Sequence, residues 1–308
     1  HVPHHVGSIN QPDASQLPGV ESVVEIAPNA SGDWLNQRST TFEAFLSIGD
    51  KGAGPGVFTL FSAGLQSNRD AWVYNFDIGS LEQRVAAHLD AYNAEVKRWG
   101  DEQMQGDDRA CQAWVSHDTT ALSWSRSLRA ALRRGQRGSV VAEHFMPASY
   151  RPFTRSHLYY DALLNHERSQ LPRLFPTRGH ANFGFYALNP GADKPFSVLT
   201  VDQIPDLALY GSNAGQFFAR WRYEKVDSDD GMLSLDTAYP SDTVVIDGYR
   251  RIDNITDHAL GLFRAAYGDT VTKDDIFFYC YGLLHSPDYR ERYAADLEKM
   301  LPRIPPVS

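Results

Sequence analysis

The sequence predicts an α+β fold, with a mixed sheet in the core and helices at both ends of the chain. Short apolar runs typical of strands lie in the middle of the chain, at residues 139–147, 156–160, 183–189 and 196–201. Segments whose apolar residues recur at helical spacing lie before and after them. Strands and helices therefore do not alternate as they would in a parallel α/β sheet.

The size and composition of the chain favour one large domain. It has 308 residues, of which 42% are hydrophobic and 12% aromatic, enough to build a substantial core. We expect residues 1–32 to be an extended lead-in or linker and residues 33–308 to form the domain, with a possible subdivision near 186–210. No apolar run is long enough to span a membrane. Cys111 and Cys280 lie far apart, which argues against a zinc site and favours the cytoplasm.

The N-terminal half is predicted to contain three helices and a strand. Residues 33–45 are expected to form a short helix and residues 57–65 a strand. Residues 81–99 have helical spacing, with Val85, Leu89 and Val96 on one stripe. Thr119 or Thr120 is expected to cap the third helix, which continues to about residue 134 before a glycine.

Two helices are predicted near the C-terminus. Thr272 followed by Asp275 is a capping-box pattern in front of an apolar run. Ser286 is expected to cap the second helix, since Pro287 suits its first position and Asp288 its positive end. These signals predict the structure of the segment and carry no functional information by themselves.

Charge is distributed unevenly along this acidic chain. The net charge is −9, yet residues 121–180 hold ten arginines, no lysine and three acids, a local charge of +7 against −16 elsewhere. Arginine suits bidentate contacts to phosphate and to guanine edges, so this basic window predicts a DNA-binding surface. The alternative is a solvated helix face with structural ion pairs. The arginines are at positions 126, 129, 133, 134, 137, 151, 155, 168, 173 and 178.

Ten residues are candidate DNA contacts. Asn182 is the predicted base-reading residue, because it lies with Arg178 in a polar loop before an aromatic strand. Asn68 and Arg69 could also read bases, although Asp70 could instead hold Arg69 in an ion pair that locks a turn. Around the rigid Pro152, we expect Tyr150 and Phe153 to be packed. The predicted phosphate contacts are Arg126, Arg129, Arg133, Arg134, Arg151 and Arg155, of which Arg151 could equally be structural.

Motifs for catalysis are missing from the sequence. It has no Asn-Pro-Pro-Tyr or Asp-Pro-Pro-Tyr tetrapeptide, no glycine-rich methyl-donor loop and no phosphate loop. The acidic groups at 227–230 and at 274–275 could hold Mg²⁺ in a cryptic nuclease. Both groups occur where a turn or a helix start calls for carboxylates anyway. The sequence therefore predicts no catalytic residue and no metal site.

Five motifs resemble, in order, the specificity region of type ISP restriction–modification enzymes. Two departures accompany the resemblance: Phe217 and Phe218 stand where a cysteine and a proline are expected near Gln216, and the family usually continues past the final PRIP. The motifs are VFTLFS leading into SNRDAWVYNF (57–76), SYRPFTRSHLYYD (149–161), GSNAGQFFARWRYE (211–224), ITDHALGLFRAAY (255–267) and YGDTVTKDDIFFYCYGLLHSPDYRERYAADLEKMLPRIP (267–305).

The resemblance implies a function for the whole chain. Enzymes of this family are bacterial single-chain proteins that join nuclease, helicase, adenine methyltransferase and target recognition in defence against phage. This chain would be the target recognition domain, which binds a specific sequence of double-stranded DNA and directs methylation and cleavage by other domains. It would bind no cofactor itself, while the parent would use S-adenosylmethionine, ATP and Mg²⁺. The rival interpretation is a coupling module that contacts only the methyltransferase and helicase domains.

Overall fold

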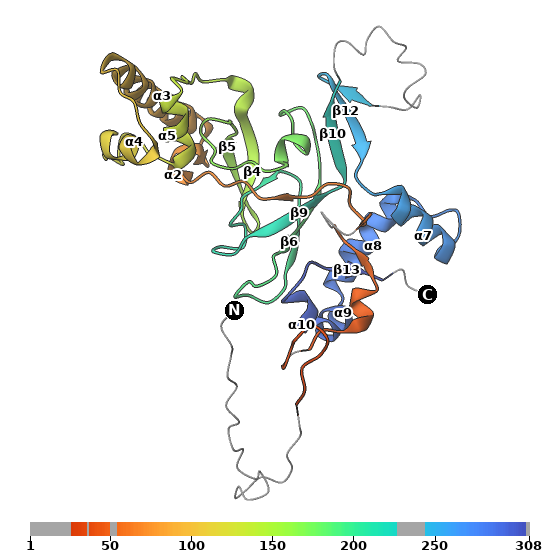
Figure 1. The fold of residues 1–308 in the computed structure, drawn as a ribbon. Helices are drawn as coiled ribbons and strands as arrows, with labels where there is room; N and C mark the ends of the chain where they lie inside the picture. The colour runs from red at the N-terminus through yellow and green to blue at the C-terminus, as the bar shows by residue number, and fades with distance from the viewer. Residues whose placement is uncertain (1–25, 36, 50–53, 227–243, 306–308) are drawn as a thin grey trace, which may run out of the picture.

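The computed structural model describes residues 26–35, 37–49, 54–226 and 244–305. Helices gather at two ends of the molecule, and short sheets lie between them (Figure 1). Most strand pairs are antiparallel, and no regular strand–helix alternation is present among these residues. The predicted α+β class is confirmed.

A first group of helices forms one end of the molecule. The long helix α3 runs from Ile78 to Asp101, and its cap is Asp77, whose carboxylate accepts a 2.7 Å hydrogen bond from the Ser80 amide. Its predicted apolar stripe is buried against the other helices and a sheet. The remaining helices of this group are α2 (Asp70–Val73), α4 (Asp108–Trp114) and α5 (Arg126–Arg133).

A four-stranded sheet packs against α3. Its strands in spatial order are β3 (Tyr74–Asn75), β5 (Thr154–Tyr159), β4 (Phe145–Arg151) and β8 (Ile204–Pro205). β4 and β5 form an antiparallel hairpin, and β8 runs parallel to β4. The short 3₁₀ helix η2 (Ala142–His144) leads into β4.

The central sheet separates two hydrophobic cores. Alternate residues of a strand point to opposite faces, so Tyr186 and Phe217 pack in the core with α3, whereas Phe185 and Phe218 pack with the C-terminal helices. Its strands in spatial order are β2 (Ser62–Ala63), β9 (Gly215–Ala219), β6 (Gly184–Leu188) and β7 (Val198–Val201). The 3₁₀ helix η3 (Leu171–Arg173) precedes β6.

A narrow antiparallel ribbon extends away from the central sheet (Figure 1). It consists of β10 (Trp221–Lys225), β12 (Tyr249–Asp253) and the two-residue strand β11 (Val245–Ile246). The ladder pairs Trp221 with Asp253 and Lys225 with Tyr249. The predicted acidic turn at 227–231 lies outside the described residues.

The C-terminal helices form the opposite end of the molecule (Figure 1). The predicted capping box is present at α8, where Thr272 and Asp275 bond each other's backbone amides, and Ser286 caps α9 as predicted. The helices are α7 (Asp257–Tyr267), α8 (Lys273–His285), α9 (Pro287–Arg292) and α10 (Ala294–Leu297). After them, β13 (Arg303–Ile304) pairs with β1 (Leu46–Ser47).

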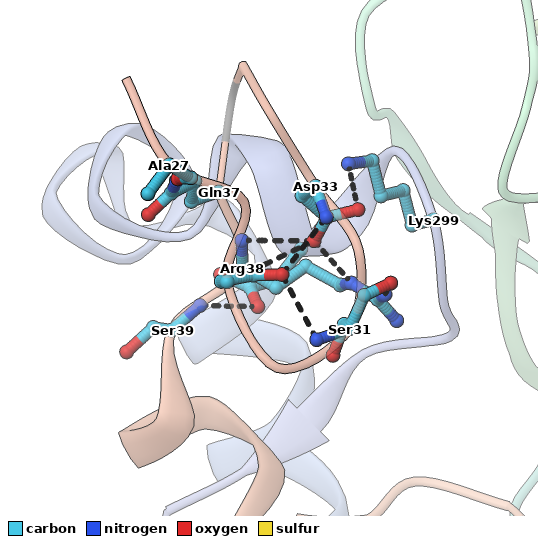
Figure 2. A network of polar contacts seen from close by, with 9 residues as sticks. Ala27, Ser31, Asp33, Gln37, Arg38, Ser39 and Lys299 are labelled. Atoms are coloured by element: carbon cyan, nitrogen blue, oxygen red, sulfur yellow. Dashed lines mark hydrogen bonds and ion pairs between the residues drawn. The ribbon is translucent and has the colours of Figure 1, made fainter. Parts of the chain in front are cut away.

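A polar network fastens the N-terminal segment to these helices (Figure 2). The carboxylate of Asp33 accepts from Arg38 at 2.9 Å and from Lys299 at 2.7 Å. Ser39 donates its amide to Asp296 at 2.9 Å. The hydrogen bonds from Arg38 and then Lys299 hold the pKa of Asp33 well below its usual range.

Three predicted elements are shorter than expected. The helix expected at 33–45 is reduced to the single turn α1 (Thr40–Glu43), and the strand expected at 57–65 is reduced to β2 with isolated bridges. The third helix begins at Arg126, because Ser125 provides its cap while Thr120 bonds Asp118 in a local turn. No described helix is long and apolar enough to cross a membrane.

Candidate nucleic-acid interface

The β4–β5 hairpin carries the motif at 149–161. Its ladder ends at the pair Arg151–Thr154, so Pro152 and Phe153 alone form the turn. Phe153 has a φ of 57°, in the left-handed region. A proline followed by a positive φ is the pattern of a type II turn, in which the second of these positions usually holds glycine or asparagine. The sequence motif thus builds a tight tip with a bulky residue on it.

Arg151 anchors the turn end of this hairpin. Its guanidinium donates to the Asp206 carboxylate at 2.8 Å and lies 3.7 Å from the Asp70 carboxylate. It also donates to the backbone carbonyl of Tyr150 at 2.6 Å and stacks on that ring at 4.0 Å from its centre. The predicted phosphate contact is therefore occupied inside the protein, where it ties β4 to α2 and to the segment after β8.

The carboxyl of Asp206 is enclosed by this arrangement. Burial, followed by the nearby charge of Asp70, raises its pKa from the usual 3.8 to about 6, and Arg151 only partly offsets them. The backbone is close-packed here as well. A Cβ on Gly64 would lie 2.5 Å from the Asp206 carbonyl oxygen, so glycine is required at that position. The region around Arg151 and Asp206, next to the hairpin turn, is thus both charged and rigidly held.

One face of the hairpin sheet is open to solvent. Arg155 and His157 are exposed on β5, whereas the alternating Ser156 and Leu158 are buried on the side that α3 covers. The ladder places Asn75 of β3 directly beside His157. We call this surface the hairpin face: the outward side chains of Asn75, Arg155 and His157 together with the tip residue Phe153.

Arg155 is the most exposed cation of the hairpin face. Its side chain is 69% exposed and bonds the Asp202 carboxylate, itself 54% exposed, at 2.8 Å. A pair this open to water contributes about 0–1 kcal/mol, so an incoming phosphate can replace the carboxylate at little cost. A cavity of about 290 Å³ lies beside it, lined by Phe153, Arg155, Thr200 and Asp202 among others.

The arginines of α5 are only partly available. Arg129 makes a two-pronged ion pair with Asp108 of α4 at 2.8 and 3.0 Å. Arg133 is half-buried, and its Nε has no described hydrogen-bond partner. Arg126 and Arg134 are exposed, one at each end of the helix, and Arg134 bonds only a glutamine side chain at 3.4 Å. This helix therefore presents two open cations rather than four.

The basic window does not form one face of unpaired charge. Among the described residues, four of its ten arginines have an acid within 4 Å, at positions 129, 151, 155 and 173. The hairpin face lies on the side of its sheet opposite to α3. The other arginines of the window belong to α5 and to separate loops.

Arg69 is buried, which does not fit a role in reading bases. It donates to the backbone carbonyls of Ser123 and Leu164 and to the Ser125 hydroxyl, and burial lowers its pKa to about 10. The alternative prediction, an Arg69–Asp70 ion pair, is wrong. Asp70 instead accepts hydrogen bonds from the Ser67 and Tyr150 hydroxyls and faces Arg151.

Asn182 likewise has a structural role. Its amide donates to the carbonyls of Leu174 and Trp221 at 2.9 and 2.8 Å, and its oxygen accepts from the amides of Phe183 and Trp221. All of its ordinary hydrogen bonds are made within the protein. Asn68 and Arg178 are exposed on separate loops, so neither belongs to the hairpin face.

The sequence did not reveal the ion pairs that the arginines of the ribbon form. Arg222 and Arg250 both bond the Glu224 carboxylate, which lies between them. Burial opposes ionisation of Glu224, but the hydrogen bonds from these two arginines outweigh it and lower its pKa. Arg220 is almost completely buried, bonds Asp253 and Asp274, and stacks on Trp221. The ion pair between Arg250 and Glu224 depends on the pairing of β10 with β12, which are far apart in the sequence.

The acidic pair at the start of α8 is also used structurally. Asp274 accepts from Arg220 at 2.6 Å, and Asp275 completes the capping box. Asp227, Asp229 and Asp230 lie outside the described residues, as does the rest of that turn. No grouping of three metal-ligating side chains occurs in the described part of the chain.

Comparison with known proteins identifies the family. A family model described as the type ISP C-terminal specificity domain matches residues 56–308. The chain belongs to this family. No match was found among the curated proteins.

Three solved structures resemble this specificity domain. A nuclease-deletion mutant of the type ISP restriction–modification enzyme LlaGI, in complex with a DNA substrate mimic, is 30% identical with a TM-score of 0.73 over 91% of this chain. The ATP-dependent type ISP enzyme LlaBIII bound to DNA is 28% identical with a TM-score of 0.73 over 92%. The DrdV–DNA complex is 28% identical with a TM-score of 0.72 over 92%. The domain spans 23%, 16% and 26% of those chains.

The specificity domain has a local explanation for its two unexpected phenylalanines. Phe217 points into one core, where its ring stacks on Phe175 at 5.7 Å, and Phe218 points into the other, where it stacks on Phe61 at 5.3 Å. Adjacent residues of β9 therefore fill both sides of the central sheet. The departure from the expected cysteine and proline is a matter of core packing.

Proposed function

We propose that this specificity domain recognises a specific sequence of double-stranded DNA through its hairpin face. The observation that carries the proposal is the open sheet surface with Arg155, His157 and Asn75 on a rigid hairpin, in a chain of this family. Arginine binds phosphates and guanine edges, and asparagine pairs with adenine edges. The three similar structures support the proposal, since their proteins are described as bound to DNA or to a DNA mimic.

In this proposal the domain directs chemistry that occurs elsewhere. Its partners would be the methyltransferase and helicase domains of a longer parent chain in the bacterial cytoplasm, which would use S-adenosylmethionine, ATP and Mg²⁺. The domain alone would neither methylate nor cleave DNA, because its sequence lacks the motifs for either reaction. Assays of ATPase, methyltransferase and nuclease activity on the isolated chain should therefore stay at background.

The salt dependence of binding tests the proposal. Each neutralised phosphate makes the slope of log K against log salt more negative by about 0.9 in duplex DNA. Replacing Arg155 by alanine should therefore make the slope shallower by about 0.9 and weaken all sequences alike. The measurement is fluorescence anisotropy with labelled random-sequence duplexes of about 30 base pairs, from about 50 to 300 mM salt.

Lys97→Ala is the matched control. Lys97 has the same charge, a 67% exposed side chain and a comparably exposed ion pair with Asp101, but it lies on α3. The control should keep the wild-type slope. Absence of duplex binding by the wild type at low salt would contradict the proposal. Equal salt slopes for Arg155→Ala and Lys97→Ala would show that the hairpin face is not the surface that binds DNA. Selection from a pool of random duplexes should then enrich one sequence.

A coupling module is the second candidate, and one surface favours it. Leu262 and Tyr267 on α7 and Phe278 on α8 are exposed large apolar residues, with Phe278 58% accessible. Exposed apolar residues that gather on one surface are typical of a protein contact. The same anisotropy series discriminates the two functions, because a coupling module would bind no duplex.

A further inference from the structure

The tip of the hairpin presents one aromatic ring to solvent. Phe153 is 91% exposed, the highest value of any large apolar residue described. Its ring contacts no other described aromatic ring. For comparison, Phe76, at a bend after β3 of the same sheet, is 67% exposed. The sequence suggested that Phe153 would be packed, and the structure contradicts this. An isolated phenyl ring in water is costly, so the position invites a functional explanation.

The backbone at the tip is unfavourable for phenylalanine as well. A φ of 57° is rare for a bulky residue and is normally met by glycine or asparagine. The chain thus places a large ring where local conformation and solvation both oppose it. Strain of this kind persists where the surrounding structure enforces it, as Arg151 and the β4–β8 pairing do next to the hairpin turn.

The surroundings of the ring favour nucleic acid over protein. Its neighbours at the tip are Arg151, Thr154, Arg155 and the small, exposed Pro152, and no second large exposed apolar side chain lies among them. A protein contact needs a broad apolar centre, of the kind that α7 and α8 display. A single ring flanked by a cation that can bind phosphate matches the wedges that proteins insert between base pairs.

We propose that Phe153 is a wedge that enters the base stack of the bound duplex, while Arg155 holds the adjacent phosphate. This inference rests on the proposed function and adds a residue that deforms the DNA. The ring replaces the stacking partner of a base that the duplex gives up. Because the hairpin is rigidly anchored, little conformational entropy is lost when the tip is inserted.

A wedge makes a prediction that a surface contact does not. Unstacking a base step costs free energy, and a duplex with a missing base has already lost that stacking. The wild type should therefore bind a duplex of about 24 base pairs with a central tetrahydrofuran abasic site about tenfold more tightly than the intact duplex of the same sequence. This preference does not require knowledge of the recognised sequence.

The test compares Phe153→Ala with Phe278→Ala by fluorescence anisotropy on both duplexes. Phe278 is an exposed phenylalanine on α8, outside the hairpin sheet. Phe153→Ala should reduce the preference to less than about twofold while binding of the intact duplex weakens only about threefold. Phe278→Ala should keep the full preference. Because Phe153 is exposed, unfolding of the variant is not expected, and its thermal transition verifies this.

The outcomes separate the inference from the proposed function. If the wild type binds neither duplex, both are overturned. If the wild type binds but shows no preference, or if Phe153→Ala keeps it, the wedge is overturned while DNA recognition stands, and the ring is assigned to a protein contact. If Phe278→Ala loses the preference equally, the effect is not local and the wedge is again overturned.

Discussion

The β4–β5 hairpin and the β10–β12 ribbon are both antiparallel and rich in arginine, yet they place this charge differently. On the ribbon, Arg222 and Arg250 both bond the carboxylate of Glu224. At the start of the ribbon, Arg220 bonds Asp253 and Asp274 and stacks on the Trp221 ring. On the hairpin, Arg151 next to the turn is fixed by its ion pair with Asp206. Arg155 lies on the open face, in a weak surface ion pair with Asp202.

The number of arginines in a segment therefore does not measure its capacity to bind phosphate. An arginine that already bonds a partly buried carboxylate would have to leave that ion pair before it could contact DNA. Arg155 can exchange its partner almost freely. The ribbon arginines therefore stabilise the fold, and the hairpin is where charge remains available.

The largest expected effect is on the unfolding free energy and concerns Asp206, the partner of Arg151 next to the hairpin turn. Asp206 has a pKa of about 6 in the fold against 3.8 normally, so the folded state binds its proton more tightly than the unfolded state does. Ionisation of Asp206 therefore lowers stability: the penalty is full above about pH 6, fades as the pH falls from about 6 to about 4, and is absent at lower pH. The unfolding free energy of Asp206→Asn minus that of the wild type should rise by up to about 3 kcal/mol from pH 4 to pH 7.

Urea unfolding at several pH values measures this difference. A constant offset between the two proteins, from the lost charge opposite Arg151, is compatible with the account. A difference that does not vary with pH would contradict it, because it would mean that Asp206 titrates alike in both states.

The second effect sharpens the contrast on the ribbon side. Arg220→Ala removes a buried guanidinium from Asp253, Asp274 and the Trp221 ring. Because both aspartates are partly solvated, we expect a loss of about 2 kcal/mol rather than the full cost of breaking a buried pair. The salt slope of DNA binding should be unchanged under conditions where the variant is folded. A shallower slope with normal stability would make the ribbon part of the interface.

The third effect tests the strain at the hairpin tip. Phe153→Gly should raise the unfolding free energy by about 1 kcal/mol, since glycine accepts the left-handed φ without steric cost. Phe153→Ala is the control, because alanine keeps the Cβ and should give no such gain. Equal stabilities of both variants would show that the tip is not strained. The glycine variant should also lose the preference for an abasic duplex.

The smallest effect is on stability at the hairpin face. Arg155→Ala should change the unfolding free energy by no more than about 0.5 kcal/mol, because its ion pair is highly exposed. The same variant is the one expected to alter the salt dependence of DNA binding. A clear destabilisation would make Arg155 a structural residue like those of the ribbon.

Local signals in the sequence predicted the elements whose information is local. The helix at 81–99, the capping box at Thr272 and the strand at 183–189 are present because periodicity and caps depend on neighbouring residues. The strand expected at 57–65 is broken up because its segments pair with residues 206, 217 and 255, which no local pattern reveals.

The candidate site was less predictable for the same reason. Asn182 and Arg69 are satisfied by carbonyls and hydroxyls up to 95 residues away, so a polar loop in the sequence became a buried network in the fold. Phe153 was expected to be packed because it is aromatic, yet the two-residue turn leaves no surface for it to pack against. Exposure at a turn depends on the ladder that surrounds it.

Hydrogen–deuterium exchange of the chain with and without duplex DNA tests whether the hairpin face is the DNA-binding surface. When DNA is bound, we expect slower exchange at the backbone amides of residues 147–157 and around Asn75. We expect no change in α5 or in the ribbon at 249–253. Protection confined to α5, the ribbon or the C-terminal helices, with the hairpin unaffected, would contradict the claim that the hairpin face is the DNA-binding surface.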